Sequence, residues 1–121
     1  MNDEKKKKEL FQEGLRQYKL MDYFESHELW EELWSDYYLE DKKFIQGLIQ
    51  LSVSFVHLGN GNMIGANNLL NKSKEKFTQF SGIHRGIDIS ILLNQIKKVE
   101  LEYKKLKNPD SFQWDLVPKL E

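Results

Sequence analysis

Residues 22–38 read DYFESHELWEELWSDYY and combine aromatic and acidic side chains with the period of an α-helix. Stepped at about 100° per residue, the acidic residues Glu25, Glu28, Glu32 and Asp36 fall on one side. The opposite arc, slightly wider than half the helix, holds Tyr23, Phe24, Ser26, His27, Trp30, Glu31, Leu33, Trp34, Tyr37 and Tyr38. The pattern predicts an amphipathic helix with Asp22 as its N-cap.

Two polar residues interrupt the aromatic arc of this helix. His27 lies at its centre, and Glu31 follows one turn later. At this i, i+4 spacing the two side chains can reach each other, and a buried carboxylate must find a partner or take up a proton. The pair is either a mutually satisfied structural contact or half of a site, as a base with its orienting acid or as two metal ligands. Glu28 lies at the edge of the same face.

Residues 41–58 show a second polar interruption in a helix that is otherwise apolar over half its circumference. Gln46, Gln50 and His57 form a narrow stripe. A strip facing water usually contains Lys and Glu, whereas amides and imidazole are typical of buried hydrogen-bonded networks. If the helices of residues 22–38 and 41–58 pack antiparallel, His27, Glu31, Gln50 and His57 converge between them, with Trp34 near Gln46.

Two histidines and one carboxylate form a common ligand set in metal enzymes. The sequence therefore gives His27, Glu31 and His57 as candidate ligands of a divalent metal. Their spacing matches neither the His-Glu-x-x-His motif of zinc proteases nor the Glu-x-x-His pair of di-iron bundles. The chain also lacks a P-loop, a dinucleotide-binding fingerprint and a nucleophile elbow.

The rest of the chain supports an all-α fold. Further helical periods cover about 3–20, 62–80 and 88–106, with Asp88 as an N-cap and Gly82 as a stop. We find no alternating strand pattern and no internal repeat, and we place His84 in a surface loop. The prediction is an antiparallel up-and-down bundle of about five helices. Residues 1–121 would form a single domain, with the tail 109–121 docked on the bundle.

One glycine lies inside the first predicted helix. Gly14 costs that helix up to about 1 kcal/mol relative to alanine. Close approach to another backbone or simple flexibility would explain it.

Composition narrows the class of protein. The 121 residues contain no cysteine, so disulfides, thiolate metal sites and cysteine nucleophiles are excluded. No apolar run has the length of a membrane span and no apolar stretch follows the charged N-terminus, so we expect a cytoplasmic protein that does not bind membranes. Residues 22–41 carry eight acids and neither lysine nor arginine. Because the aromatic residues are interleaved with acids, we expect no nucleic-acid binding.

Several of these residues also form the pattern of a known family. The segments YFESHE (23–28), WE (30–31), Trp34, QGLIQL (46–51) and His57, followed by GN (61–62), GA (65–66) and GID (86–88), resemble the bacterial family called domain of unknown function 309. The resemblance covers roughly residues 10–93. It implies an all-helical bundle of about this size and no assigned activity.

Carried over residue by residue, the family pattern falls on His27, Glu28, Glu31, Trp34, Gln46, Gly47, Gln50 and His57. The chain departs from the expected pattern at three serines. Ser26 stands where alanine is expected, and Ser52 and Ser54 replace small apolar residues.

Two function hypotheses follow. In the first, the chain is a small ligand- or partner-binding protein whose polar cluster comprises His27, Glu28, Glu31, Trp34, Gln46, Gln50 and His57. Its aromatic residues, Trp30, Tyr37 and Tyr38 among them, also make a homodimer plausible. In the second, the chain is a metal-dependent or acid–base enzyme of the hydrolase type. His27 and His57 then act as ligands or bases, Glu31 as the third ligand or the orienting acid, and Gln46 and Gln50 position the substrate.

Overall fold

A computed structural model of the chain describes residues 2–121. The helices are α1 (Asn2–Lys19), α2 (Tyr23–Asp36), α3 (Lys42–Gly59), α4 (Met63–Phe77) and α5 (Ile89–Lys105). Two short strands, β1 (Ile83–His84) and β2 (Ile87–Asp88), lie between α4 and α5, and two 3₁₀ turns, η1 (Pro109–Ser111) and η2 (Trp114–Leu116), follow α5. The helices begin and end within three residues of the predicted boundaries.

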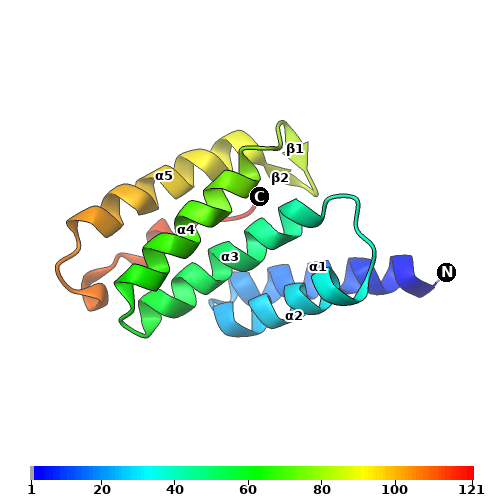
Figure 1. Ribbon diagram of the computed structural model, residues 1–121, viewed down its shortest axis with the longest axis horizontal. Helices are drawn as coiled ribbons and strands as arrows, with labels where there is room; N and C mark the ends of the chain where they lie inside the picture. Colours follow the sequence, from blue (N-terminus) through cyan, green and yellow to red (C-terminus); the bar gives the residue numbers. More distant parts are fainter. Residues whose placement is uncertain (1) are drawn as a thin grey trace.

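The helices follow an up-and-down path, and each packs against the next along the chain (Figure 1). Helix α5 also packs against α4, although a loop and the β1–β2 hairpin separate the two helices in sequence. The predicted all-α antiparallel bundle is therefore confirmed. None of the helices in residues 2–121 combines the length and apolar character that crossing a membrane requires.

Helix α2 begins where the sequence predicts. The Asp22 carboxylate accepts a hydrogen bond from the backbone N–H of Glu25 at 3.0 Å, as an N-cap does. The buried residues of the helix are Tyr23, Ser26, Trp30 and Leu33. The predicted inward arc was too wide, because Phe24, Glu31 and Tyr38 are exposed. Tyr38 lies beyond the last helical residue, Asp36, where the helical period no longer applies.

Helix α3 is the central element, with α2 on one side and α4 on the other. Ten of its residues are buried, from Phe44 to Leu58. This agrees with the apolar half-circumference seen in the sequence. Gly47 allows close approach to α4, since a Cβ atom there would lie 2.9 Å from the Phe77 ring and 3.0 Å from Lys76 Cβ.

The β1–β2 hairpin is a small β element within the all-α fold, and no strand pattern in the sequence announces it. Ile83 pairs with Asp88 and His84 with Ile87 in an antiparallel two-residue ladder. Helix α4 ends at Phe77, so Gly82 does not close it as predicted. Gly82 instead lies in the loop before β1 with φ of +69°, a conformation that glycine adopts without strain. Strands this short show no alternating pattern in sequence.

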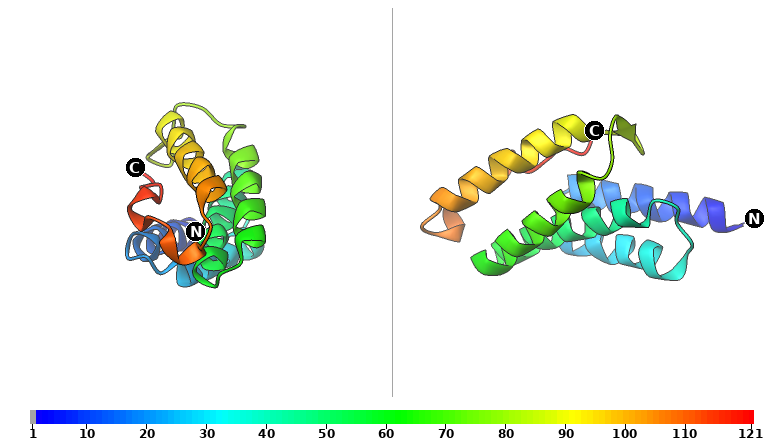
Figure 2. Two further views of the ribbon diagram at one scale, coloured as in Figure 1. Left: turned by 90° about the vertical axis from the view of Figure 1, so that its left-hand side faces the viewer. Right: turned by 45° about the horizontal axis from the view of Figure 1, so that its top comes forward.

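The segment after α5 returns along the bundle and lies beside α1 and α2 (Figure 2, left). Phe112, Val117 and Leu120 are buried. Tyr18 of α1 donates a hydrogen bond to the carbonyl oxygen of Pro118 at 2.8 Å, and the Asp88 N–H donates to the Glu121 carbonyl at 3.2 Å. These contacts tie the last residues to the end of α1 and to the start of α5.

Candidate functional site

Two contacts fix the register between α2 and α3. Ser26 Oγ lies 3.0 Å from Ser52 Oγ, and the ring centroids of Tyr23 and Phe55 are 5.3 Å apart. The two helices are therefore antiparallel, so residues 27–34 of α2 run beside about 51–44 of α3. Gln46 and Gln50 fall within this window. We call the surface formed by His27, Glu28, Glu31, Trp34, Gln46 and Gln50 the α2–α3 polar face.

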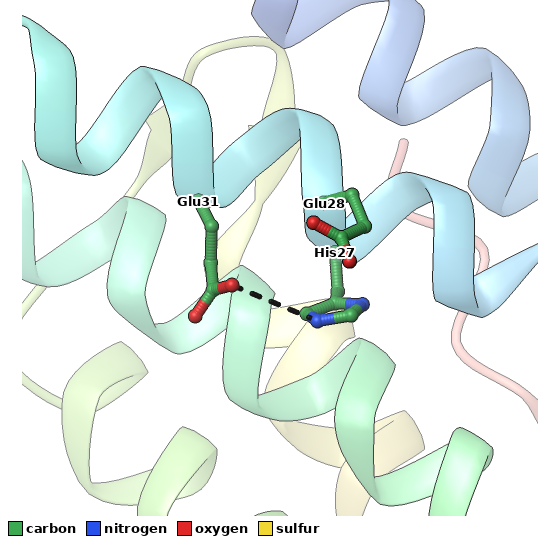
Figure 3. A group of neighbouring side chains, drawn as sticks. All are labelled: His27, Glu28 and Glu31. Atoms are coloured by element: carbon green, nitrogen blue, oxygen red, sulfur yellow. Dashed lines mark ion pairs between the residues drawn. The ribbon is translucent and has the colours of Figure 1, made fainter.

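The imidazole of His27 is held by its own helix. Its Nδ1 atom lies 2.6 Å from the Phe24 carbonyl oxygen. Because a carbonyl only accepts, Nδ1 carries the proton and donates it there. In the neutral ring Nε2 then holds the lone pair, and it lies 3.7 Å from Glu31 Oε2. The dashed line in Figure 3 marks this pair, with both side chains on the same side of α2.

When His27 is neutral and Glu31 is ionised, the two facing atoms, Nε2 and Oε2, are both hydrogen-bond acceptors, and neither can donate to the other. Either a proton on Nε2 or a third group that donates or is positive must lie between them for the contact to be attractive. The His27 side chain is 15% exposed and that of Glu31 is 55% exposed. The predicted burial of Glu31 is wrong, because its carboxylate extends beyond the contact between α2 and α3 into solvent.

Glu28 joins this pair as a third candidate ligand and the second oxygen donor. His27, Glu28 and Glu31 each offer one ligand atom, and these atoms all lie within 4.8 Å of one another. A metal-binding histidine commonly donates its other ring N–H to a backbone carbonyl, and His27 makes this bond to Phe24. The donor set of one imidazole and two carboxylates fits a divalent ion that accepts nitrogen and oxygen ligands.

His57 does not belong to this set of three. It lies beyond Phe55, at the level of the α1–α2 turn, where Val56 and Gly59 line a cavity together with Met21 and Asp22. Its Nδ1 atom is 3.4 Å from Asn62 Nδ2. A Cβ atom at Gly65 would meet its ring at 2.8 Å. The structure thus places His57 against the start of α4.

Two atoms of the α2–α3 polar face are buried without a partner. Among residues 2–121, the indole N–H of Trp34 and the side-chain oxygen Oε1 of Gln50 are the buried side-chain polar atoms that make no hydrogen bond. Buried polar groups in folded proteins are nearly always paired. One unpaired donor on α2 and one unpaired acceptor on α3 are thus buried at this face. Lys42 covers the Trp34 ring, with Nζ 4.2 Å from its centroid.

The comparisons with known proteins agree with the sequence pattern. A family model described as Domain of unknown function (DUF309) matches residues 11–69. This match covers 59 of the 121 residues and supports the resemblance of the chain to the DUF309 family. No curated protein matches the chain, and no solved structure matches it either. The DUF309 match includes every residue of the α2–α3 polar face and also His57, but it ends before the β1–β2 hairpin and α5.

A charged cluster that the sequence pattern did not reveal joins Asp41, inside the DUF309 match, to His84 and Arg85 beyond its end. Asp41 Oδ2 lies 2.8 Å from His84 Nε2, and Arg85 donates to the same carboxylate through Nε and Nη2. We call these three residues the Asp41 cluster. Arg85 also lies over the Phe11 ring of α1, 4.8 Å from its centroid. Asp41 precedes α3 but makes no side-chain cap bond.

Burial alone would raise the pKa of Asp41, but hydrogen bonds from Arg85 and His84 outweigh it, so the pKa is lowered. One signal for this cluster exists in the sequence. Asp41 is the last of the eight acids in residues 22–41, a stretch without lysine or arginine, and the HRG segment at 84–86 is the cationic part of a glycine-flanked loop.

Proposed function

We propose that the chain is a ligand-binding protein and that the α2–α3 polar face binds a small polar molecule. The observation that supports this most directly is the pair of unpartnered buried atoms, Trp34 Nε1 and Gln50 Oε1. A ligand with both an acceptor and a donor pairs with both atoms. Leaving a buried polar group unpaired costs about 1–3 kcal/mol, so satisfying two of them favours binding.

The surrounding residues suit a polar ligand. His27 Nε2 accepts when neutral and donates when protonated, Glu31 accepts, and the Gln46 amide does both. The chemistry resembles a recognition site more than a catalytic one, since none of these residues is a nucleophile held by a base. The proposal follows the first function hypothesis. It locates the ligand-binding residues on α2 and α3 and leaves His57 out of the binding site.

The test combines native mass spectrometry with NMR. We expect untagged protein, purified gently, to retain an adduct of constant mass that is lost in Gln50→Leu and kept in Gln12→Leu, an exposed glutamine on α1. Adding the extracted compound should shift the Trp34 indole and Gln50 amide resonances together. An unliganded protein whose Trp34 indole N–H is shown by crystallography to donate to an ordered water would refute the proposal.

A second candidate function is divalent-metal binding by His27, Glu28 and Glu31. The observation that favours it is the clustering of three ligand atoms within 4.8 Å, with the His27 ring fixed by Phe24. A metal bound there would support the hypothesis of a metal-dependent enzyme. Its third ligand would be Glu28 instead of His57. Substrate would then meet the ion at an exposed face, beside Gln46 and Gln50.

Elemental analysis of untagged protein prepared without chelators distinguishes the two. The metal proposal expects stoichiometric zinc, manganese or iron, lost in Glu31→Gln and kept in Glu32→Gln, the next residue of the same helix. His57→Ala should retain the ion. A metal-free wild-type protein that also fails to take up added zinc or manganese rules out this second candidate and leaves the first untouched.

The homodimer stays a prediction. Part of its original support is gone, because Trp30 is completely buried in the monomer. Phe24 and Tyr38 still present exposed aromatic surface, 56% and 77% accessible. A cytoplasmic location and the absence of nucleic-acid binding likewise remain predictions.

A further inference from the structure

The C-terminal segment and the α1–α2 turn enclose a cavity away from the α2–α3 polar face. Its volume is about 540 Å³, within the range of small-molecule sites. We call it the tail cavity. It is lined by Tyr18, Lys19, Met21, Tyr23, Trp114, Asp115, Val117, Pro118, Lys119 and Glu121. Six of these ten residues come from 114–121, outside the DUF309 match.

Aromatic side chains form the inner wall of the tail cavity. Tyr23 and Trp114 stack with an interplanar angle of 17° and a centroid distance of 5.9 Å. Tyr18 meets Tyr23 edge-on at 5.3 Å, and its hydroxyl is already used by the Pro118 carbonyl. Val117 and Met21 complete the apolar lining. Such walls favour a flat apolar molecule.

Besides the Tyr18 hydroxyl, this inner wall carries two polar groups, the Trp114 indole N–H and the Tyr23 hydroxyl. Of these two residues, Tyr23 is the more deeply buried. Its side chain is only 8% exposed, yet its hydroxyl makes no hydrogen bond with any residue from 2 to 121. Tyr23 lines both the tail cavity and an adjoining cavity of about 400 Å³. Burial raises the pKa of Tyr23 to about 12, so the hydroxyl stays protonated at neutral pH and can donate.

The charges around the cavity cancel. Lys19 and Lys119 are matched in number by Asp115 and Glu121. A ligand with net charge gains nothing from this rim, and transferring its charge next to the aromatic wall is costly. Met21 lies at the exposed mouth, where its flexible thioether can adapt to the shape of a guest.

We propose that the tail cavity binds an uncharged, flat and largely apolar molecule that accepts a hydrogen bond from Tyr23, such as an aromatic ketone or amide. This site is separate from the α2–α3 polar face and does not depend on the function proposed there.

Two uncharged fluorescent probes test the proposal on the full-length protein. 6-Propionyl-2-(dimethylamino)naphthalene carries a ketone, and N-phenyl-1-naphthylamine has a similar apolar body without one. We expect both to bind saturably with one site per chain. Tyr23→Phe should weaken the ketone probe by roughly 3- to 10-fold, the loss of one hydrogen bond, and change the other probe by less than a factor of two.

Blocking variants locate the site. Val117→Phe fills the cavity and should abolish binding of both probes, whereas Ile64→Ala, at an exposed apolar residue of α4, should leave binding unchanged. If Val117→Phe does not fold, Met21→Glu at the exposed mouth should weaken both probes instead. Equal affinity of the ketone probe for wild type and Tyr23→Phe, or a loss in Ile64→Ala as large as that in the blocking variants, would overturn the proposal.

Discussion

Ser26 and Ser52 are buried, and each is the hydrogen-bond partner of the other, at 3.0 Å. Both positions depart from the small apolar residues expected in the family. Ser54 departs in the same way and bonds to the Ala66 carbonyl at 2.7 Å and to the Tyr103 hydroxyl at 3.0 Å. Each of these three serine hydroxyls thus finds a partner, as buried polar groups usually do.

We predict that the two serines are energetically coupled. Ser26→Ala or Ser52→Ala alone leaves one buried hydroxyl unpaired and should cost about 1–2 kcal/mol in the free energy of unfolding. The double variant should cost less than the sum by at least about 0.5 kcal/mol, as measured by urea unfolding. Ser73 bonds within its own helix to Leu70, so Ser26→Ala and Ser73→Ala should simply add. Strict additivity of the first pair would contradict the mutual bond.

At the scale of elements, the packing of α1 on α2 depends on one glycine. A Cβ atom on Gly14 would lie 2.2 Å from Trp30 Nε1 and 2.6 Å from Cδ1. The close contact is with an indole ring and not, as one sequence-based explanation held, with another backbone. Trp30 is fully buried, and its N–H donates to the Phe11 carbonyl at 3.2 Å. The hydrogen bond and the complete burial of the ring keep it from moving away from an added Cβ atom.

We predict that Gly14→Ala destabilises the protein by about 1–3 kcal/mol, the usual cost of overpacking a core. Helix propensity alone would give the opposite sign, a gain of about 1 kcal/mol. Gly59→Ala is the matched control, because Gly59 is also helical and nothing lies within 4 Å of its added Cβ. Thermal unfolding measures both, and a Gly14→Ala variant as stable as wild type would show that α1 does not approach α2 so closely.

At the scale of the whole molecule, the Asp41 cluster joins three parts of the chain. Asp41 precedes α3, His84 and Arg85 come from the β1–β2 hairpin region, and Arg85 contacts Phe11 of α1. Arg85 adopts φ of +49°, which is unusual for a residue other than glycine. Because two hydrogen bonds to one carboxylate support this conformation, the hairpin is held against the DUF309-matched region by charge as well as by packing.

The lowered pKa of Asp41 predicts how stability depends on pH. Its carboxylate stabilises the fold above the ordinary value near 4, and this contribution is lost as pH falls through the lower value of the folded state. Asp41→Asn should cost about 2 kcal/mol at pH 7 and lose less stability than wild type on further acidification. Glu40→Gln, the exposed neighbour, should behave as wild type. Parallel pH profiles of wild type and Asp41→Asn would refute the role of the cluster.

The sequence by itself predicted the helices, their order and two of their N-caps. Asp22 and Asp88 cap α2 and α5 through bonds to residues three positions ahead, and this local geometry can be read from neighbours in sequence. The apolar period of α3 likewise predicted its central place. These features follow from contacts within a few residues, where the helical period fixes which side chains meet.

Only the tertiary structure decided which polar residues meet across helices. The register set by Ser26 and Ser52 brings Gln50 beside α2 and leaves His57 at the start of α4. Likewise, the return of residues 109–121 along α1 creates the tail cavity, and the hairpin brings His84 and Arg85 to Asp41, more than forty residues away. Such contacts depend on how whole elements pack. No local period encodes that packing, so the polar residues were visible in the sequence but their partners were not.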